Sequence, residues 1–230
     1  MGPMKTPHLL LATALLVGCN SAAAPAPSPE SKPAAATPTG AHAQAAAASG
    51  AEVGKAAPDF TLTDFEGKAV HLADLRGKTV VLEWFNPDCP YVKASHTKGS
   101  LNGLAKRWTD KGVVWLGVDS AAPGKQGHDP ERVSLAVGAF GLHHPILADE
   151  TGKVGHLYGA TNTPHLFVID PKGVLVYRGA IDNSPDGEGE SPAGGKLVNY
   201  VDTALQALAA GKAVETKETQ AYGCGVKYGS

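Results

Sequence analysis

Two short segments, each with two apolar residues separated by a polar one, lie on either side of a turn near residue 67. Residues 60–62 and 70–72 flank a turn at 66–68, which is a pattern typical of a β-hairpin. Two continuous apolar runs follow at 79–85 and 113–118. Short uninterrupted runs of this kind are typical of strands that are buried on both faces of a sheet. We therefore expect a hairpin and two central strands.

Helical patterns occur in three places. The first helix is predicted to begin at Pro90 and to carry apolar residues at helical spacing as far as Trp108. Glycines in its middle weaken it and predict a kink. Further helices are expected at 132–140 and 196–208.

A second pair of strands is predicted at 163–170 and 173–179, joined by a turn at 171–173. The resulting order is ββ-βαβα-ββα, in which a parallel βαβ unit precedes an antiparallel pair and a terminal helix. We therefore expect an α/β fold with a central mixed β-sheet flanked by helices on both faces.

The N-terminal part of the chain differs in composition. Residues 1–19 carry Lys5, an apolar run and small residues, which is the pattern of a signal peptide. Residues 20–50 are almost wholly Ala, Pro, Ser and Thr, a composition that buries too little apolar surface to offset the entropy of ordering. We therefore predict a leader, a disordered linker and one domain at 51–230.

The end of the leader, Leu16-Val17-Gly18-Cys19, resembles the bacterial lipobox. This resemblance implies that Cys19 is acylated by diacylglycerol, and an ordinary cleavable signal is the alternative. We expect an exported protein with a lipid anchor as its membrane contact, on the periplasmic side of the bacterial envelope. Asn20 favours the outer membrane.

Charge and cysteine count exclude several functions. The formal net charge of −2 gives no basic footprint for nucleic acid. The cysteines are Cys19, Cys89 and Cys224, without a CxxC pair, so the chain is neither a disulfide scaffold nor a zinc ribbon. No metal site and no cofactor are predicted.

Cys89 is the strongest candidate for chemistry. It follows a buried strand and precedes Pro90, which favours the first position of a helix. Unpaired amides and the helix dipole at such a position stabilise a thiolate. The neighbouring Asp88 opposes this unless its side chain caps the helix. The alternative is a small buried apolar residue.

Several segments carry a family resemblance: residues 54–62, 67–68, 72–78, 84–93, 163–164 and 223–228. They resemble the redoxin, or peroxiredoxin-like, branch of the thioredoxin superfamily. The resemblance implies a thioredoxin-like fold with Cys89 as nucleophile. It also implies a cis-proline at Pro164, in a loop that packs beside the sulfur and pairs with an extended substrate. Pro90, Thr163 and Pro164 are then the substrate-binding residues.

The chain departs from the family pattern at three positions. Val92 stands where a dithiol thioredoxin has its second cysteine. Leu82 and Asn86 stand where peroxiredoxins carry the proline and threonine of the peroxide-binding pocket. A local resolving thiol and a peroxiredoxin pocket are therefore not expected.

Glu83 lies where thioredoxins keep a buried carboxylate that moves protons, so it is a candidate proton acceptor. The alternative is an edge or bulge position where the carboxylate reaches water or a basic partner. Cys224 is a candidate resolving thiol, because loop-closure entropy grows only slowly with length. Its alternative is a free or packed tail cysteine. His165, after the expected cis-proline, is a candidate ligand or acid-base group or, alternatively, a loop histidine.

The function expected from these residues is thiol-disulfide exchange by an oxidoreductase of the cell envelope. Its partners would be protein thiols or disulfides and an unidentified electron donor. The first alternative is a peroxidase that reduces a hydroperoxide through a sulfenic acid at Cys89. The second is a non-enzymatic module that binds thiols or copper. Residues 182–195 are expected to form a solvated loop.

Overall fold

The computed structural model describes residues 50–192 and 195–230. The predicted leader, Cys19 and all but the last residue of the predicted linker lie outside these ranges. Within the described ranges, none of the helices has the length and apolar character needed to cross a membrane.

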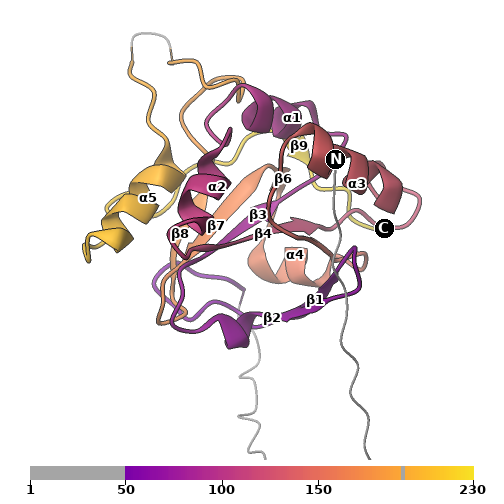
Figure 1. Cartoon of the computed structure of the whole chain (residues 1–230), viewed down its shortest axis with the longest axis horizontal. Helices are drawn as coiled ribbons and strands as arrows, with labels where there is room; N and C mark the ends of the chain where they lie inside the picture. Colours follow the sequence, from indigo (N-terminus) through magenta and orange to yellow (C-terminus); the bar gives the residue numbers. More distant parts are fainter. Residues whose placement is uncertain (1–49, 193–194) are drawn as a thin grey trace, which may run out of the picture. The chain divides into compact units, whose positions relative to one another are not determined.

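A mixed sheet forms the centre of the domain (Figure 1), with the strand order β2-β1-β5-β4-β3-β7-β8. The strands are β1 (Thr61–Asp64), β2 (Ala69–His71), β3 (Val80–Trp84), β4 (Val114–Asp119), β5 (Ile146–Ala148), β7 (His165–Ile169) and β8 (Leu175–Gly179). Strands β3, β4 and β5 are mutually parallel, whereas β1, β7 and β8 pair antiparallel with their neighbours. The predicted mixed sheet is confirmed.

Short helices connect these strands. They are η1 (Leu72–Leu75), α1 (Pro90–Thr97), α2 (Leu104–Thr109), α3 (Pro130–Ala139), α4 (Lys153–Tyr158) and α5 (Tyr200–Ala209). A separate small sheet joins β6 (Asn162–Thr163) to β9 (Cys224–Gly225) near the C-terminus.

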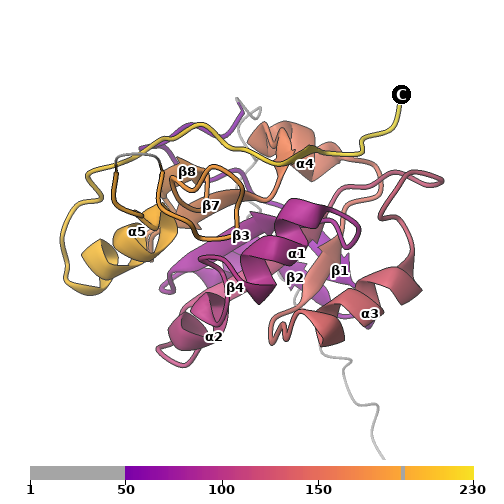
Figure 2. The same ribbon diagram turned by 90° about the horizontal axis from the view of Figure 1, so that it is seen from above.

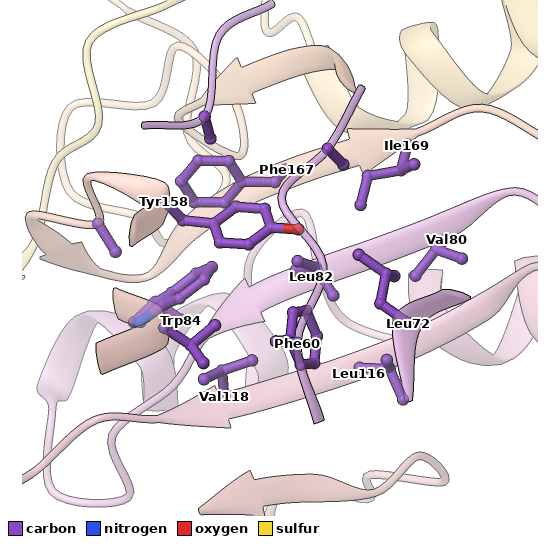
Figure 3. Packing of buried hydrophobic residues seen from close by; sticks show 14 of the residues in the cluster. Phe60, Leu72, Val80, Leu82, Trp84, Leu116, Val118, Tyr158, Phe167 and Ile169 are labelled. Atoms are coloured by element: carbon purple, nitrogen blue, oxygen red, sulfur yellow. The ribbon is translucent and has the colours of Figure 1, made fainter. Parts of the chain in front are cut away.

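Strand β3 lies between β4 and β7 and is buried along its whole length. Its alternate side chains enter two different cores. Leu82 and Trp84 pack with Tyr158 of α4 and with Phe167, where the Trp84 and Phe167 ring centroids are 5.0 Å apart (Figure 3). Val81 faces the opposite side, among residues of α2 and α5.

Helices α1, α2, α3 and α5 pack on one face of the sheet, and α4 with the segment before β1 packs on the other (Figure 2). The predicted coverage of both faces is therefore confirmed. Because β3 is central and buried, the end of this strand is a rigid place from which α1 begins.

The predicted first helix is two helices, α1 and α2, rather than one kinked helix. Between them Gly99 passes so close to the loop after β8 that a Cβ would collide with the carbonyl oxygen of Gly187. Gly103 has a φ of +66° at the start of α2. The short elements β5, α4 and β9 are not predicted from the sequence, because two to six residues are too few to reveal a period.

The loop that follows β8 is packed at its start rather than fully solvated. Asp182 is only 1% exposed, and it accepts hydrogen bonds from the hydroxyl groups of Ser100 and Tyr222. The backbone amide of Ser184 also donates to Asp182, at 2.9 Å. The expectation of a solvated loop is therefore wrong for these first residues, because the C-terminal segment covers them.

Replacement of Gly99 by alanine should destabilise the domain by about 1–3 kcal/mol, since the added methyl group displaces the backbone at Gly187. Urea unfolding followed by far-UV circular dichroism measures the change. Gly138→Ala in α3 is the matched control: a Cβ there meets nothing, and alanine should stabilise the helix by up to about 1 kcal/mol. Equal free energies of unfolding for Gly99→Ala and the parent chain would contradict the close approach.

Candidate active site

Cys89 lies just after β3 and is the N-cap residue of α1, with an extended backbone (φ −79°, ψ 120°) and Pro90 in the first turn. The predicted position at a helix N-terminus is therefore observed. The Cys89 side chain is 2% exposed and packs among Phe85, Val92 and Val133. Its sulfur makes no capping hydrogen bond to the amides of α1.

Two groups from distant parts of the chain contact the Cys89 sulfur. The carbonyl oxygen of Thr163 lies 3.0 Å from it, and the Thr163–Pro164 peptide bond is cis, as expected. The Sγ atom of Cys224 lies 2.8 Å from it. A carbonyl oxygen only accepts hydrogen bonds, so Cys89 in this arrangement is a thiol that donates to Thr163.

The C-terminal segment reaches Cys89 as a strand. β9 pairs antiparallel with β6, so that Cys224 lies opposite Thr163 and Gly225 opposite Asn162. Gly223 has a φ of +115°, and a Cβ there would collide with the Thr163 carbonyl group. Only glycine therefore fits where this segment passes the cis-proline loop.

Hydrogen bonds hold the C-terminal segment on both sides of Cys224. Before it, the hydroxyl group of Tyr222 donates to Asp182 at 2.7 Å. After it, the hydroxyl group of Tyr228 donates to the carbonyl oxygen of Ala160 at 2.8 Å. These contacts lie outside β9 and help to hold Cys224 against Cys89.

The Cys224 thiol ionises less readily than an ordinary cysteine. Burial raises the pKa of Cys224 to about 11, with further contributions from its hydrogen bond with Cys89 and from the charge of Cys89. Cys224 therefore stays protonated at neutral pH, which suits it to be the thiol that acts second rather than the attacking group.

The charge of Asp88 is compensated by a residue that the sequence did not single out. Asp88 forms an ion pair with Arg132, near the start of α3, rather than capping α1 with its side chain. A cation so close offsets the effect of Asp88 on a thiolate at Cys89. Forty-four residues separate the pair, so no local pattern points to it.

Two residues stand where peroxiredoxins carry the proline and threonine of their pocket, and each has a structural role here. Leu82 is fully buried in the core beside Trp84. The Asn86 side chain donates to the carbonyl oxygen of Gln126 at 2.9 Å and accepts from the amide of Asp88 at 2.9 Å. Asn86 thus braces the turn that leads to Cys89.

Glu83 is fully buried in the middle of the central strand β3, so the alternative of an edge or bulge position is wrong. Its carboxylate lies 2.6 Å from Nε2 of His96 and accepts from the indole of Trp115 at 3.0 Å. Burial alone would raise the pKa of Glu83, but the charge and hydrogen bond of His96 outweigh it, helped by His144 and Trp115, and leave this pKa below its usual value. The sequence did not identify His96 as the partner of Glu83.

His165 lies in β7 and is 7% exposed. Its Nδ1 accepts from the amide of Thr161 at 3.3 Å, and its ring centroid is 4.5 Å from that of Phe167. Burial lowers the pKa of His165 to about 4, with a smaller contribution from Arg178, so the ring is neutral at physiological pH. The ring is therefore hydrogen-bonded and neutral, as the alternative expected, but it lies in strand β7 and not in a loop. Among the described residues, no group of three or more His, Cys, Asp or Glu side chains could hold a metal ion.

A thiol at the N-terminus of the helix after a central strand, facing a cis-proline loop, defines the thiol oxidoreductases of the thioredoxin-like fold. The chain belongs to the Redoxin family, whose model matches residues 52–197.

Relatives support this assignment. Thiol-disulfide oxidoreductase ResA of Bacillus thuringiensis (strain Al Hakam) is 31% identical over 127 residues, which cover 54% of this chain and 68% of ResA. The selenocysteine-containing peroxiredoxin PrxU of Peptoclostridium acidaminophilum is 32% identical over 143 residues, which cover 59% of this chain and 64% of PrxU. The predicted class, a thiol-disulfide oxidoreductase, is confirmed by the family match and by the similarity to ResA.

Solved structures give the same fold. An uncharacterised conserved protein of Geobacillus kaustophilus superimposes with a TM-score of 0.67 and 30% identity, covering 77% of this chain and 93% of its own. A hypothetical protein of Sinorhizobium meliloti 1021 superimposes with a TM-score of 0.68 and 26% identity, covering 79% of this chain and 97% of its own. The predicted thioredoxin-like fold is confirmed.

The ionisation of Cys224 gives a direct test of the site. In the full chain, the ¹³Cβ resonance of Cys224 should titrate with a midpoint above pH 10. Cys89→Ala removes the charge and the hydrogen bond of Cys89 and should lower this midpoint, although burial still keeps it above about 8.5, the usual value for cysteine. A midpoint at or below that usual value in the unmodified chain would contradict the arrangement of the two thiols.

Proposed function

We propose that Cys89 and Cys224 together form the redox centre of this Redoxin protein, with Cys89 as nucleophile and Cys224 as resolving thiol. The distance of 2.8 Å between their Sγ atoms is the observation that carries the proposal. A disulfide bond is about 2.05 Å long, so a small movement of β9 suffices to form one. The pair replaces the local second cysteine, whose place Val92 occupies.

The reaction proceeds in two exchange steps. The Cys89 thiolate attacks one sulfur of a substrate disulfide, and the other substrate sulfur leaves as a thiolate that takes up a proton. Cys224 then loses its proton and attacks the Cys89 sulfur, which releases the second substrate thiol. The substrate gains two electrons, and the protein is left with a Cys89–Cys224 disulfide that an external thiol donor reduces.

The substrates are protein disulfides or thiols, in line with the thiol-disulfide oxidoreductases among the relatives. Thr163 and Pro164 position the second thiol, because Thr163 pairs with Cys224. Pro90 starts α1 and fixes the backbone that presents Cys89. Glu83, in its buried pair with His96, is the candidate proton acceptor beneath α1.

Cysteine substitutions test this centre. Cys89→Ser should reduce insulin disulfide reduction by at least about a hundredfold, because no other thiol stands at the helix N-terminus. Cys224→Ser should accumulate a mixed disulfide at Cys89, which mass spectrometry identifies. Cys19→Ser is the matched control and should leave the rate unchanged.

Two outcomes would count against the proposal. Full activity of Cys224→Ser without trapped intermediate would remove the resolving role. Oxidation of Cys89 to a sulfenic acid by hydroperoxide, faster than any exchange with disulfides, would favour a peroxidase, whose sulfenic acid Cys224 would also resolve.

We further propose that the protein is exported and anchored through a lipid on Cys19, on the periplasmic side of the outer membrane. The signal-peptide pattern and the lipobox-like Leu16-Val17-Gly18-Cys19 support this location. The domain would then meet its protein substrates and its thiol donor outside the cytoplasm.

Cys19→Ser should shift the protein from the membrane pellet to the soluble fraction of disrupted cells, because the acylated sulfur is lost. Mass spectrometry of the mature N-terminus measures the lipid directly. Cys224→Ser serves as the control and should stay in the pellet. Recovery of unmodified Cys19 in the mature chain would rule out the anchor.

A further inference from the structure

The edge of the cis-proline loop is already occupied by the chain itself. Cys224 pairs with Thr163 across β9 and β6, and the amide of Val226 donates to the carbonyl oxygen of Thr161 at 3.1 Å. An extended substrate strand would need these same backbone groups. A substrate therefore meets Cys89 elsewhere as long as β9 stays in place.

The geometry of thiol-disulfide exchange indicates on which side of Cys89 the substrate lies. When Cys224 attacks a mixed disulfide, the attacking sulfur, the Cys89 sulfur and the leaving sulfur must lie nearly in line. Cys224 approaches from the side of β9 and the Thr163 carbonyl group. The leaving sulfur of the substrate must then lie on the opposite side of Cys89.

A cavity of about 400 Å³ opens at Cys89 between α1 and α3. Residues of the loop before α1, of α1 itself and of α3 line it, and neither β9 nor the cis-proline loop contributes to its wall. Figure 2 shows the C-terminal segment and α3 on opposite sides of α1. The cavity is therefore where the leaving sulfur would lie.

The walls of the cavity suit a particular kind of segment. Phe140 and Leu135 give it an apolar side, and Leu135 is 70% exposed, more than the other large apolar residues of the described ranges. Lys93 and Arg132 line the cavity with Asp88. Because Asp88 is paired with Arg132, the positive charge of Lys93 is left without compensation among these lining residues.

We propose that the cavity between α1 and α3 is the docking site for the substrate disulfide, and that β9 stays paired with β6 during the exchange. The substrate is a protein disulfide on a protruding loop, with an acidic residue and an apolar residue beside the reacting cysteine. This inference rests on the proposed redox centre and adds its substrate site.

Two synthetic loop peptides test the site on the full chain. They share one disulfide and one leucine and differ in carrying either glutamate or lysine beside the cysteines. The full chain should reduce the glutamate peptide with a kcat/KM roughly fivefold higher, the effect of one exposed charge pair. Lys93→Glu should invert this preference, and Leu135→Ser should raise KM for both peptides alike. Lys212→Glu, an equal charge change beyond α5, should leave the preference as it is.

A measurement in the Cys224→Ser variant distinguishes substrate docking in the cavity from substrate pairing along the cis-proline loop. Tyr228→Ala weakens the hold on the C-terminal segment by removing its hydrogen bond to Ala160 and its stacking on His156, where the centroids are 4.0 Å apart. Formation of the mixed disulfide at Cys89 should keep the same rate. A several-fold acceleration would mean that the segment must leave first, and would overturn the proposal.

An equal rate for both peptides with the full chain and with Lys93→Glu would likewise overturn the docking site, while leaving the redox centre intact. Failure of the proposed redox centre would give a different result: Cys89→Ser would turn over both peptides at an undiminished rate.

Discussion

The short antiparallel pairing of β9 with β6 is the interaction on which the proposed redox centre depends. It places Cys224 opposite Thr163 and so against the Cys89 sulfur. Ordering a chain end costs roughly 1–2 kcal/mol per residue, and the pairing alone covers only two residues of each strand. The hydrogen bonds of Tyr222 and Tyr228 on either side offset that cost. Gly223 lets the backbone pass close enough to the cis-proline loop.

This arrangement brings together two thiols from distant parts of the chain. One thiol follows the buried central strand β3, and the other lies on a C-terminal segment held by backbone pairing and by the side chains of Tyr222 and Tyr228. Val92, fully buried at the position of a second local thiol, has become part of the core. The proposed exchange therefore requires the C-terminal segment to be docked.

The carboxylates around the site are compensated by charged or hydrogen-bonding partners rather than by solvent. Asp88 is matched by Arg132 of α3, and the fully buried Glu83 is matched by His96 of α1. Removing one partner of a buried pair costs about 3–5 kcal/mol because the other charge is left uncompensated. The Glu83–His96 pair therefore ties α1, which carries Cys89, to the central strand.

The sequence by itself determined the α/β class, the central strands and the place of Cys89 at the start of α1. These features follow from local patterns: continuous apolar runs, and proline and glycine at special backbone positions. The cis-proline was implied by the resemblance to the redoxin family and not by a local pattern. Only the tertiary structure decided that Cys224 reaches Cys89, that Asp88 is paired with Arg132 and that Glu83 finds His96 rather than water. Each of these depends on residues that are distant along the chain or on opposite elements, and such contacts leave no periodic signal in a single sequence.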